Sequence, residues 1–196
     1  MMAGHPLEPT DPHDVGGGGG GGGARLAVLV ALWRVEGGSG EHAVAAACDL
    51  VVDGSVDAGV LDLAAAPHDA DVADLDGTID DVLVETGSPA RAGESPFDHA
   101  LRLLACSVVT GVHTAEFLTL WQHRWGTADD PRLAPFALAE RWYAALDRDP
   151  DGTTLHRDGL DRDGLDAAVR EEAAALAGGA ASPGAVERLV GGQPGG

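Results

Sequence analysis

Residues 95–110 read SPFDHALRLLACSVVT, and this stretch decides the fold class. Ser95 offers a side-chain oxygen for a helix N-cap, Pro96 suits the first helical position, and Asp98 places a carboxylate in the first turn. The apolar residues that follow recur at helical spacing and are expected on one buried face: Leu101, Leu104, Ala105 and Val108. The stretch therefore predicts an amphipathic helix.

The same pattern of cap, apolar stripe and terminating glycine or proline recurs on both sides of this helix. It predicts helices over 24–34, 41–52, from Ser55 or Asp57 to 63, from Asp71 or Asp74 to 85, from His113 or Thr114 to 125, and from after Pro131 to 146. Nowhere do β-branched residues alternate with polar ones over a useful length, so no strand is expected. We expect an all-α protein, a single bundle of about six to seven helices spanning residues 24–146.

The second of these helices, residues 41–52, has an apolar pattern that predicts which of its side chains face the core. The expected inward stripe consists of Val44, Ala45, Cys48, Val51 and Val52. Cys48 and Cys106 both fall within apolar helical patterns, where free cysteine behaves as a small hydrophobe. We expect both thiols to be buried and free rather than paired in a disulfide.

The two ends of the chain have a different composition from the middle. Residues 1–23 finish in a run of eight glycines, which predicts a disordered leader and a flexible linker. Residues 147–196 are rich in charge and lack aromatic residues, so we expect an acidic, largely disordered tail. Its alanine content predicts one helix over 165–176, which is expected to be solvated because it has little to bury.

The overall charge narrows the classes of partner. The chain has 32 carboxylates and 12 basic residues, all of them arginine, which gives a formal net charge of -20. Such a field repels phosphate backbones, so nucleic-acid binding is not expected. A basic protein or a cation suits it better.

Membrane association is not expected either. The longest apolar stretch, residues 26–33, is much shorter than the roughly 20 residues that cross a bilayer. Residues 1–23 contain acidic residues and no arginine, unlike the start of a secretory signal. We therefore expect a cytoplasmic protein.

One short motif resembles a catalytic sequence. Residues 74–79 read DLDGTI, which looks like the nucleophile motif of haloacid-dehalogenase-type phosphatases, where the first aspartate attacks phosphorus at the end of a buried strand. The preceding residues, HDADVA, cannot form that strand, and the motif is expected to be a capped, acidic helix start. We find no catalytic constellation and expect a non-enzymatic protein without a cofactor.

The densest concentration of charge is the candidate partner-binding site. Seven carboxylates fall within seventeen residues: Asp69, Asp71, Asp74, Asp76, Asp80, Asp81 and Glu85. A patch of this kind speeds the approach of a basic partner, and its attraction weakens with salt. The alternative for the same residues is a solvated helix face.

A second acidic segment is the candidate cation site. Asp147, Asp149, Asp151 and Asp158 occupy positions 1, 3, 5 and 12 of a twelve-residue stretch that resembles an EF-hand calcium loop, with Gly152 at position 6. The stretch departs from the pattern at position 12, where glutamate is usual. A flexible acidic linker is the alternative interpretation.

Three segments carry a resemblance to known proteins: Leu32-Trp33-Arg34, residues 43–65 (AVAAACDLVVDGSVDAGVLDLAA) and residues 111–126 (GVHTAEFLTLWQHRWG). Their helix rhythm looks like that of uncharacterised small helical proteins of high-GC bacteria. More distantly, the pattern is similar to immunity proteins of the colicin D type. That resemblance implies an acidic helical bundle that inhibits a basic ribonuclease toxin.

Taken as a sequence, the chain therefore predicts a non-enzymatic protein-interaction module, immunity-like or regulatory, that binds a basic protein through the carboxylates of residues 69–85. The alternative is a calcium-responsive helical protein that uses residues 147–158. The identity of the partner and the oligomeric state are left open.

Overall fold

The computed structural model describes residues 20–38, 40–127, 129–148 and 160–191. In these residues all regular structure is helical, as expected, and no strand occurs. The elements are α1 (Gly20–Glu36), α2 (Glu41–Val52), α3 (Ala58–Ala64), the 3-10 turn η1 (Val72–Leu75), α4 (Asp76–Glu85), α5 (Pro96–Val109), α6 (Ala115–Trp125), α7 (Ala134–Arg148), α8 (Arg162–Gly178) and α9 (Ala185–Gly191). None of the described helices is long and apolar enough to cross a membrane.

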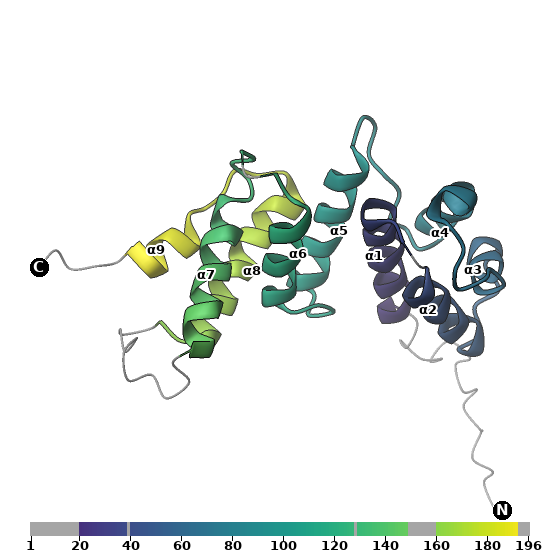
Figure 1. Ribbon diagram of the computed structural model, residues 1–196, viewed down its shortest axis with the longest axis horizontal. Helices are drawn as coiled ribbons and strands as arrows, with labels where there is room; N and C mark the ends of the chain where they lie inside the picture. The colour runs from purple at the N-terminus through teal and green to yellow at the C-terminus, as the bar shows by residue number, and fades with distance from the viewer. Residues whose placement is uncertain (1–19, 39, 128, 149–159, 192–196) are drawn as a thin grey trace, which may run out of the picture.

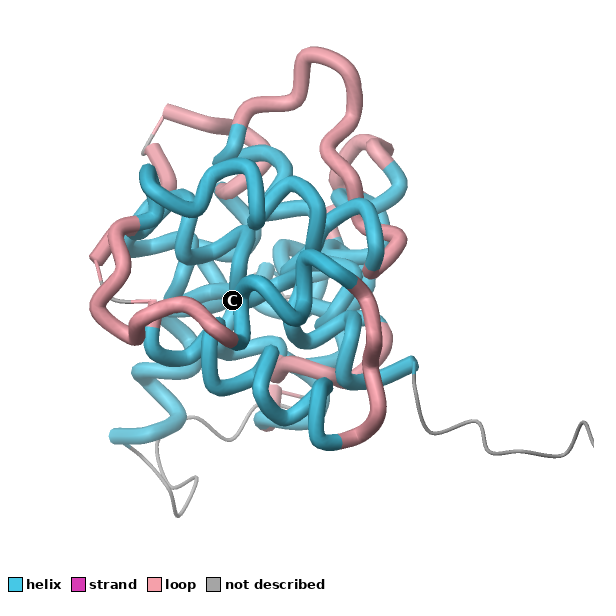
Figure 2. Tube along the Cα trace, turned by 90° about the vertical axis from the view of Figure 1, so that its right-hand side faces the viewer, coloured by secondary structure: helices cyan, strands magenta, loops and turns pink. Residues whose placement is uncertain are grey.

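The helices form an elongated arrangement with α5 at its centre (Figure 1). Helix α5 packs on α1 at one side and on α8 at the other, while α2, α3 and α4 lie at the α1 end and α6, α7 and α9 at the α8 end. Figure 2, viewed from the end at which α3 and α4 lie, shows the helical layers behind one another. Because α5 touches both halves, it is the element on which the core is organised.

The local prediction for α5 is confirmed. The Ser95 hydroxyl accepts the backbone N–H of Asp98 at 3.1 Å, and Pro96 begins the helix. The four expected core residues, Leu101, Leu104, Ala105 and Val108, are all buried. His99 and Leu103 are buried as well, so the helix is covered on more than one side.

The N-terminal boundary was predicted too late. Helix α1 begins at Gly20, so the last four residues of the expected leader, 20–23, are helical. A Cβ atom at Gly22 would lie 2.6 Å from Cδ2 of Leu50, which means that glycine allows α1 to approach α2 closely there. Residues 1–19 lie outside the described residues.

The prediction of a largely disordered tail was wrong for residues 160–191, and the helix count of six to seven was too low. The helix expected over 165–176 is present within α8, but it is not solvated: Leu165, Val169 and Ala173 are fully buried against the rest of the core. Helix α9, which was not predicted, buries Val186. The packed core therefore extends beyond the C-terminal boundary of the expected 24–146 domain.

The inward stripe predicted for α2 was only partly right: Val44 is buried and Val51 is half-buried against the core, whereas Ala45, Cys48 and Val52 are exposed. The bounds of the helix, 41–52, are confirmed, but its buried residues are Ala43, Val44 and Ala47. Cys48 is exposed rather than buried, and Val52 is 86% exposed. The buried face of α2 packs against α1 and α3, and Val52, at the end of the helix, lies in solvent. Both cysteines are free, and Cys106 is half-buried.

Candidate functional site

The α2–α4 end of the molecule is strongly acidic. We call residues 41–85 the acidic lobe; they contain no lysine or arginine. Their twelve carboxylates are Glu41, Asp49, Asp53, Asp57, Asp62, Asp69, Asp71, Asp74, Asp76, Asp80, Asp81 and Glu85. Because the twelve arginines lie elsewhere in the chain, the charge of the molecule is concentrated on this lobe.

All seven carboxylates of the predicted partner site are exposed, but they do not share one role. Asp76 and Asp80 pair with Arg34 of α1, at 2.6 Å and 2.8 Å. The Arg34 side chain is only 15% exposed, so this fork ties α4 to α1. The two aspartates are thus part of the architecture, and reversing their charge would disturb the fold as well as any complex.

Two further members of the set cap helices. The Asp71 carboxylate accepts the backbone N–H of Ala73 at the start of η1, at 2.9 Å. The Glu85 carboxylate accepts the N–H of Gly59 at 3.0 Å and that of Val60 at 3.3 Å, at the start of α3. These bonds satisfy donors that a helix start leaves open.

The remaining three members of the set are Asp69, Asp74 and Asp81. In the described part of the chain, none of the three side chains takes part in a hydrogen bond or an ion pair that would fix it. All three lie exposed at the surface of the lobe. They are therefore the members of the predicted set best placed to meet an external cation.

The acidic lobe also exposes large apolar side chains. Val52 is 86% exposed, Val56 84% and Val84 63%, and Leu61 is exposed too. These four residues come from α2, the loop after it, α3 and α4. The lobe thus combines negative charge with apolar surface, a combination typical of surfaces that bind proteins.

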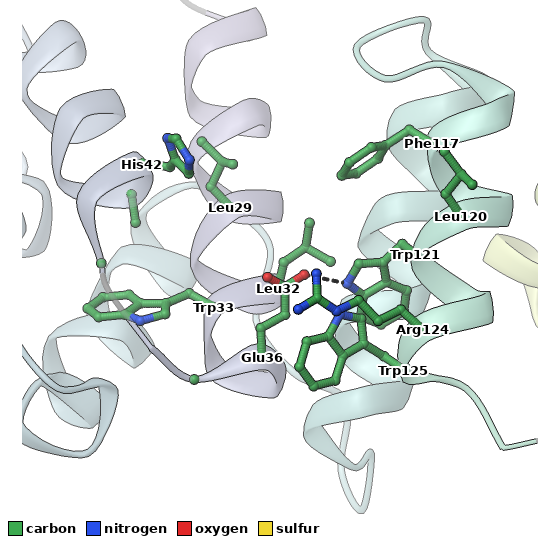
Figure 3. A pocket seen from close by; sticks show the side chains of 13 residues that line it. Leu29, Leu32, Trp33, Glu36, His42, Phe117, Leu120, Trp121, Arg124 and Trp125 are labelled. Atoms are coloured by element: carbon green, nitrogen blue, oxygen red, sulfur yellow. Dashed lines mark hydrogen bonds between the residues drawn. The ribbon is translucent and has the colours of Figure 1, made fainter.

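A separate pocket of about 390 Å³ opens between α1 and α6. Figure 3 shows Leu29, Leu32 and Glu36 of α1 on one wall and Phe117, Leu120 and Trp125 of α6 on the other. Phe117 and Leu120 are partly exposed at 39% and 53%. Trp33, Gly37, Gly40, His42, Ala43, Trp121 and Arg124 complete the lining.

The floor of the pocket is held by aromatic contacts. Trp121 stacks on Phe97 with ring centroids 5.4 Å apart. Its indole Nε1–H donates to the Glu36 carboxylate at 2.8 Å, which connects α6 to α1. A Cβ atom at Gly40 would lie 2.4 Å from the Trp33 ring, so glycine is needed where α2 begins beside that ring.

The sequence did not reveal this pocket. Of the three tryptophans in its lining, Trp33 and Trp121 are buried and Trp125 is half-buried. A signal was present, because Trp33 precedes the glycine-rich break at 37–40 and Trp125 precedes Gly126. Aromatic residues at helix ends beside glycines can line an opening, but only the placement of α1 beside α6 in the tertiary structure shows where it lies.

The predicted cation site is not assembled in the described residues. Asp149, Asp151 and Asp158 lie outside them. Asp147 is described, and its carboxylate pairs with Arg162, which also pairs with Glu116 at 2.7 Å. Within the described residues, no group of three or more histidine, cysteine or carboxylate side chains could hold a metal ion.

A serine and a histidine lie close together on α5 and the turn after it. His113 Nδ1 is 3.0 Å from the Ser107 hydroxyl. That hydroxyl donates to the carbonyl of Leu104 at 2.7 Å, so its proton is not directed at the imidazole. Ser107 is buried, which also keeps it from a substrate.

Comparison with protein-family models, curated proteins and solved structures finds no match to this chain. The likeness to immunity proteins of the colicin D type therefore stays a prediction from sequence. Within the described residues, the acidic lobe and the pocket between α1 and α6 are the features from which we infer a function.

Proposed function

We propose that the protein is a non-enzymatic interaction module whose acidic lobe binds a basic partner protein. The observation that supports this proposal is the composition of the lobe. It has twelve carboxylates and no lysine or arginine, and it exposes Val52, Val56 and Val84. A basic ribonuclease toxin is the kind of partner that the immunity resemblance implies, and a basic protein under regulation is the alternative.

The two kinds of surface would contribute differently to such a complex. The carboxylates would accelerate encounter with a positively charged surface, and this effect falls as salt increases. The exposed valines would supply the desolvated contacts that slow dissociation. Asp76, Asp80 and Glu85 would act mainly by keeping α3 and α4 in place, because Arg34 and the N-terminus of α3 already occupy them.

The test is a comparison of matched full-length baits in lysate of the native host, at low and high salt. One variant neutralises the free carboxylates of the lobe, Asp69→Asn, Asp74→Asn and Asp81→Asn. A second, Val56→Ser with Val84→Ser, removes apolar surface and leaves the charge unchanged. The control variant, Asp129→Asn with Asp163→Asn, neutralises exposed carboxylates outside the lobe.

We expect one basic protein to be retained by the wild type and the control, to be lost at high salt, and to be depleted with both lobe variants. The captured protein, once purified, should bind the full chain directly with the same ranking of variants. Retention of the same proteins by all four baits, or recovery of no basic protein, would contradict the proposal.

A further inference from the structure

The pocket between α1 and α6 has the size and lining of a small-molecule site. Its volume of about 390 Å³ lies at the lower end of the range for ligand pockets, roughly 300–1,000 Å³. The walls are mainly aromatic and aliphatic, with few polar groups (Figure 3). Pockets of this composition bind a ligand's apolar body and orient it through those few groups.

Glu36 is the polar group that distinguishes this pocket. One of its oxygens accepts the Trp121 indole N–H at 2.8 Å, which fixes the carboxylate beside the aromatic floor. In the described part of the chain, no arginine or histidine forms an ion pair with Glu36. A carboxylate keeps acceptor sites after one hydrogen bond, so Glu36 can still receive an N–H donor from a ligand.

Aromatic faces beside a carboxylate favour a positive ligand. The Arg124 guanidinium lies 5.1 Å from the centroid of the Trp125 ring, so one face of the lining already holds a planar cation. The net charge of -20 raises the local concentration of cations and lowers that of anions. An anion could pair with Arg124, but it would approach the Glu36 carboxylate and the field of the whole molecule.

We propose that this pocket binds a small organic cation, in which a flat aromatic or branched apolar body carries one ammonium group. The body lies between Leu29 and Phe117, which face each other across the pocket (Figure 3), and the ammonium donates to the Glu36 carboxylate. The site is on the face between α1 and α6. Its lining takes only His42 and Ala43 from the acidic lobe, so it does not depend on the carboxylates that are proposed to bind the protein partner.

Three probes of one shape test the charge requirement on the full chain: 2-phenylethylamine as the cation, 2-phenylethanol as the neutral analogue and 3-phenylpropanoate as the anion. Ligand-detected NMR and calorimetric titration give the affinities. We expect the amine to bind about tenfold more tightly than the alcohol, the difference of one charge-assisted hydrogen bond, and the anion to bind most weakly.

Three variants test the assignment to residues. Glu36→Gln keeps an acceptor for Trp121, and it should weaken the amine about tenfold while leaving the alcohol unchanged. Arg124→Gln removes a like charge and should tighten the amine. The control, Asp74→Asn, removes a carboxylate outside the pocket and should change neither affinity.

Retained binding of the alcohol to Glu36→Gln shows that this variant is folded. Equal affinity for amine and alcohol would overturn the cation assignment, as would tightest binding of the anion with its loss in Arg124→Gln. Absence of binding by all three probes would overturn the site itself. None of these results changes the expectation for protein baits, so this inference and the proposed function fail separately.

Discussion

Glu85 stabilises a helix other than its own. It ends α4, yet its carboxylate accepts backbone N–H groups of Gly59 and Val60 at the start of α3. The close approach requires glycine at position 59, where a Cβ atom would lie 2.9 Å from both the Glu85 carboxylate and the Val82 backbone nitrogen. A single residue thus joins α3 to α4.

We therefore predict that Glu85→Ala lowers the free energy of unfolding by about 1 kcal/mol, the usual contribution of an N-cap. Glu85→Gln, which keeps one acceptor oxygen, should lower it less, and Gly59→Ala should lower it through steric overlap. Urea denaturation gives the three values. An equal loss in Asp81→Ala, a neighbouring carboxylate without a capping role, would argue against the cap.

The buried His99 side chain makes the free energy of unfolding depend on pH. Its side chain is 2% exposed, and its Nε2–H donates to the Ser88 carbonyl at 2.9 Å. Burial lowers the pKa of His99 below its ordinary value of 6.5, and the positive charge of Arg102 acts in the same direction. Since the unfolded chain binds a proton more readily, stability should fall as pH decreases below about 6.5 toward the folded pKa.

The prediction is that His99→Gln, which retains an N–H donor, flattens the decline in unfolding free energy between neutral pH and pH about 5. Burial lowers the pKa of His113 as well, so part of the slope should remain until His113 is also replaced. Urea denaturation across pH measures both. An unchanged slope in the double variant would assign the decline to other groups.

Acid stability has a second source in a lower pH range. The Arg102 guanidinium donates to both oxygens of Glu94 and lowers the pKa of that carboxyl to about 2 from its ordinary value of 4.5. Because this pKa is depressed by folding, the stabilisation is complete above about 4.5 and is lost toward pH 2. The histidine and carboxylate effects are therefore separable by pH.

At the scale of elements, α8 carries more of the core than its sequence suggests. Leu165, Ala168, Val169 and Ala173 lie on one side of the helix at spacings of three to four residues and are buried in the main cluster. Three of these four side chains are alanine or valine. The apolar face of α8 is therefore small in area, but it still packs against α5 and α7. Small apolar residues on one helix face can be fully buried when the neighbouring helices approach closely.

Leu165→Ala should accordingly lower the free energy of unfolding by about 2–5 kcal/mol, as expected for a fully buried leucine. Leu120→Ala, at a side chain 53% exposed, is the matched control and should have a much smaller effect. Thermal and urea denaturation measure both variants. If Leu165→Ala matched the control, α8 would be peripheral, and a chain ending at residue 148 should then be as stable as the whole.

At the scale of the whole molecule, charge is unevenly distributed. The acidic lobe has no lysine or arginine of its own, and Arg34 reaches it from α1. In the described α6–α9 region, by contrast, arginines lie close enough to carboxylates to form ion pairs, as Arg162 does with Glu116. Repulsion within the lobe therefore opposes folding at low ionic strength.

Raising NaCl from about 0.02 to about 0.3 M, which shortens the Debye length several-fold, should therefore raise the unfolding temperature. Neutralising Asp69, Asp74 and Asp81 together as asparagines should raise it at low salt and reduce the response to salt. Calorimetry at both salt concentrations measures these effects. A fall in unfolding temperature with salt would mean that the Arg34 pairs outweigh the repulsion.

The sequence predicted the helices wherever the local signals were complete. Ser95 caps α5 as expected, Thr114, one of the two expected starting residues, caps α6, and the bounds of α2 were predicted correctly. Capping and apolar periodicity act over a few residues, so they can be recognised without the fold. The all-helical class and the density of charge around Asp69–Glu85 follow from the same local information.

What each of those residues does was decided by tertiary structure. Arg34 and Asp80 are 46 positions apart, and Trp121 and Glu36 are 85 positions apart, yet each pair is hydrogen-bonded. Local patterns also could not show that Val52 stays in solvent while Leu165 is buried. The amino-acid sequence alone was enough to predict the helices and the net charge, because helices depend on residues close together in the chain and net charge depends on composition. The pocket and the paired carboxylates form only where helices distant in the sequence come into contact.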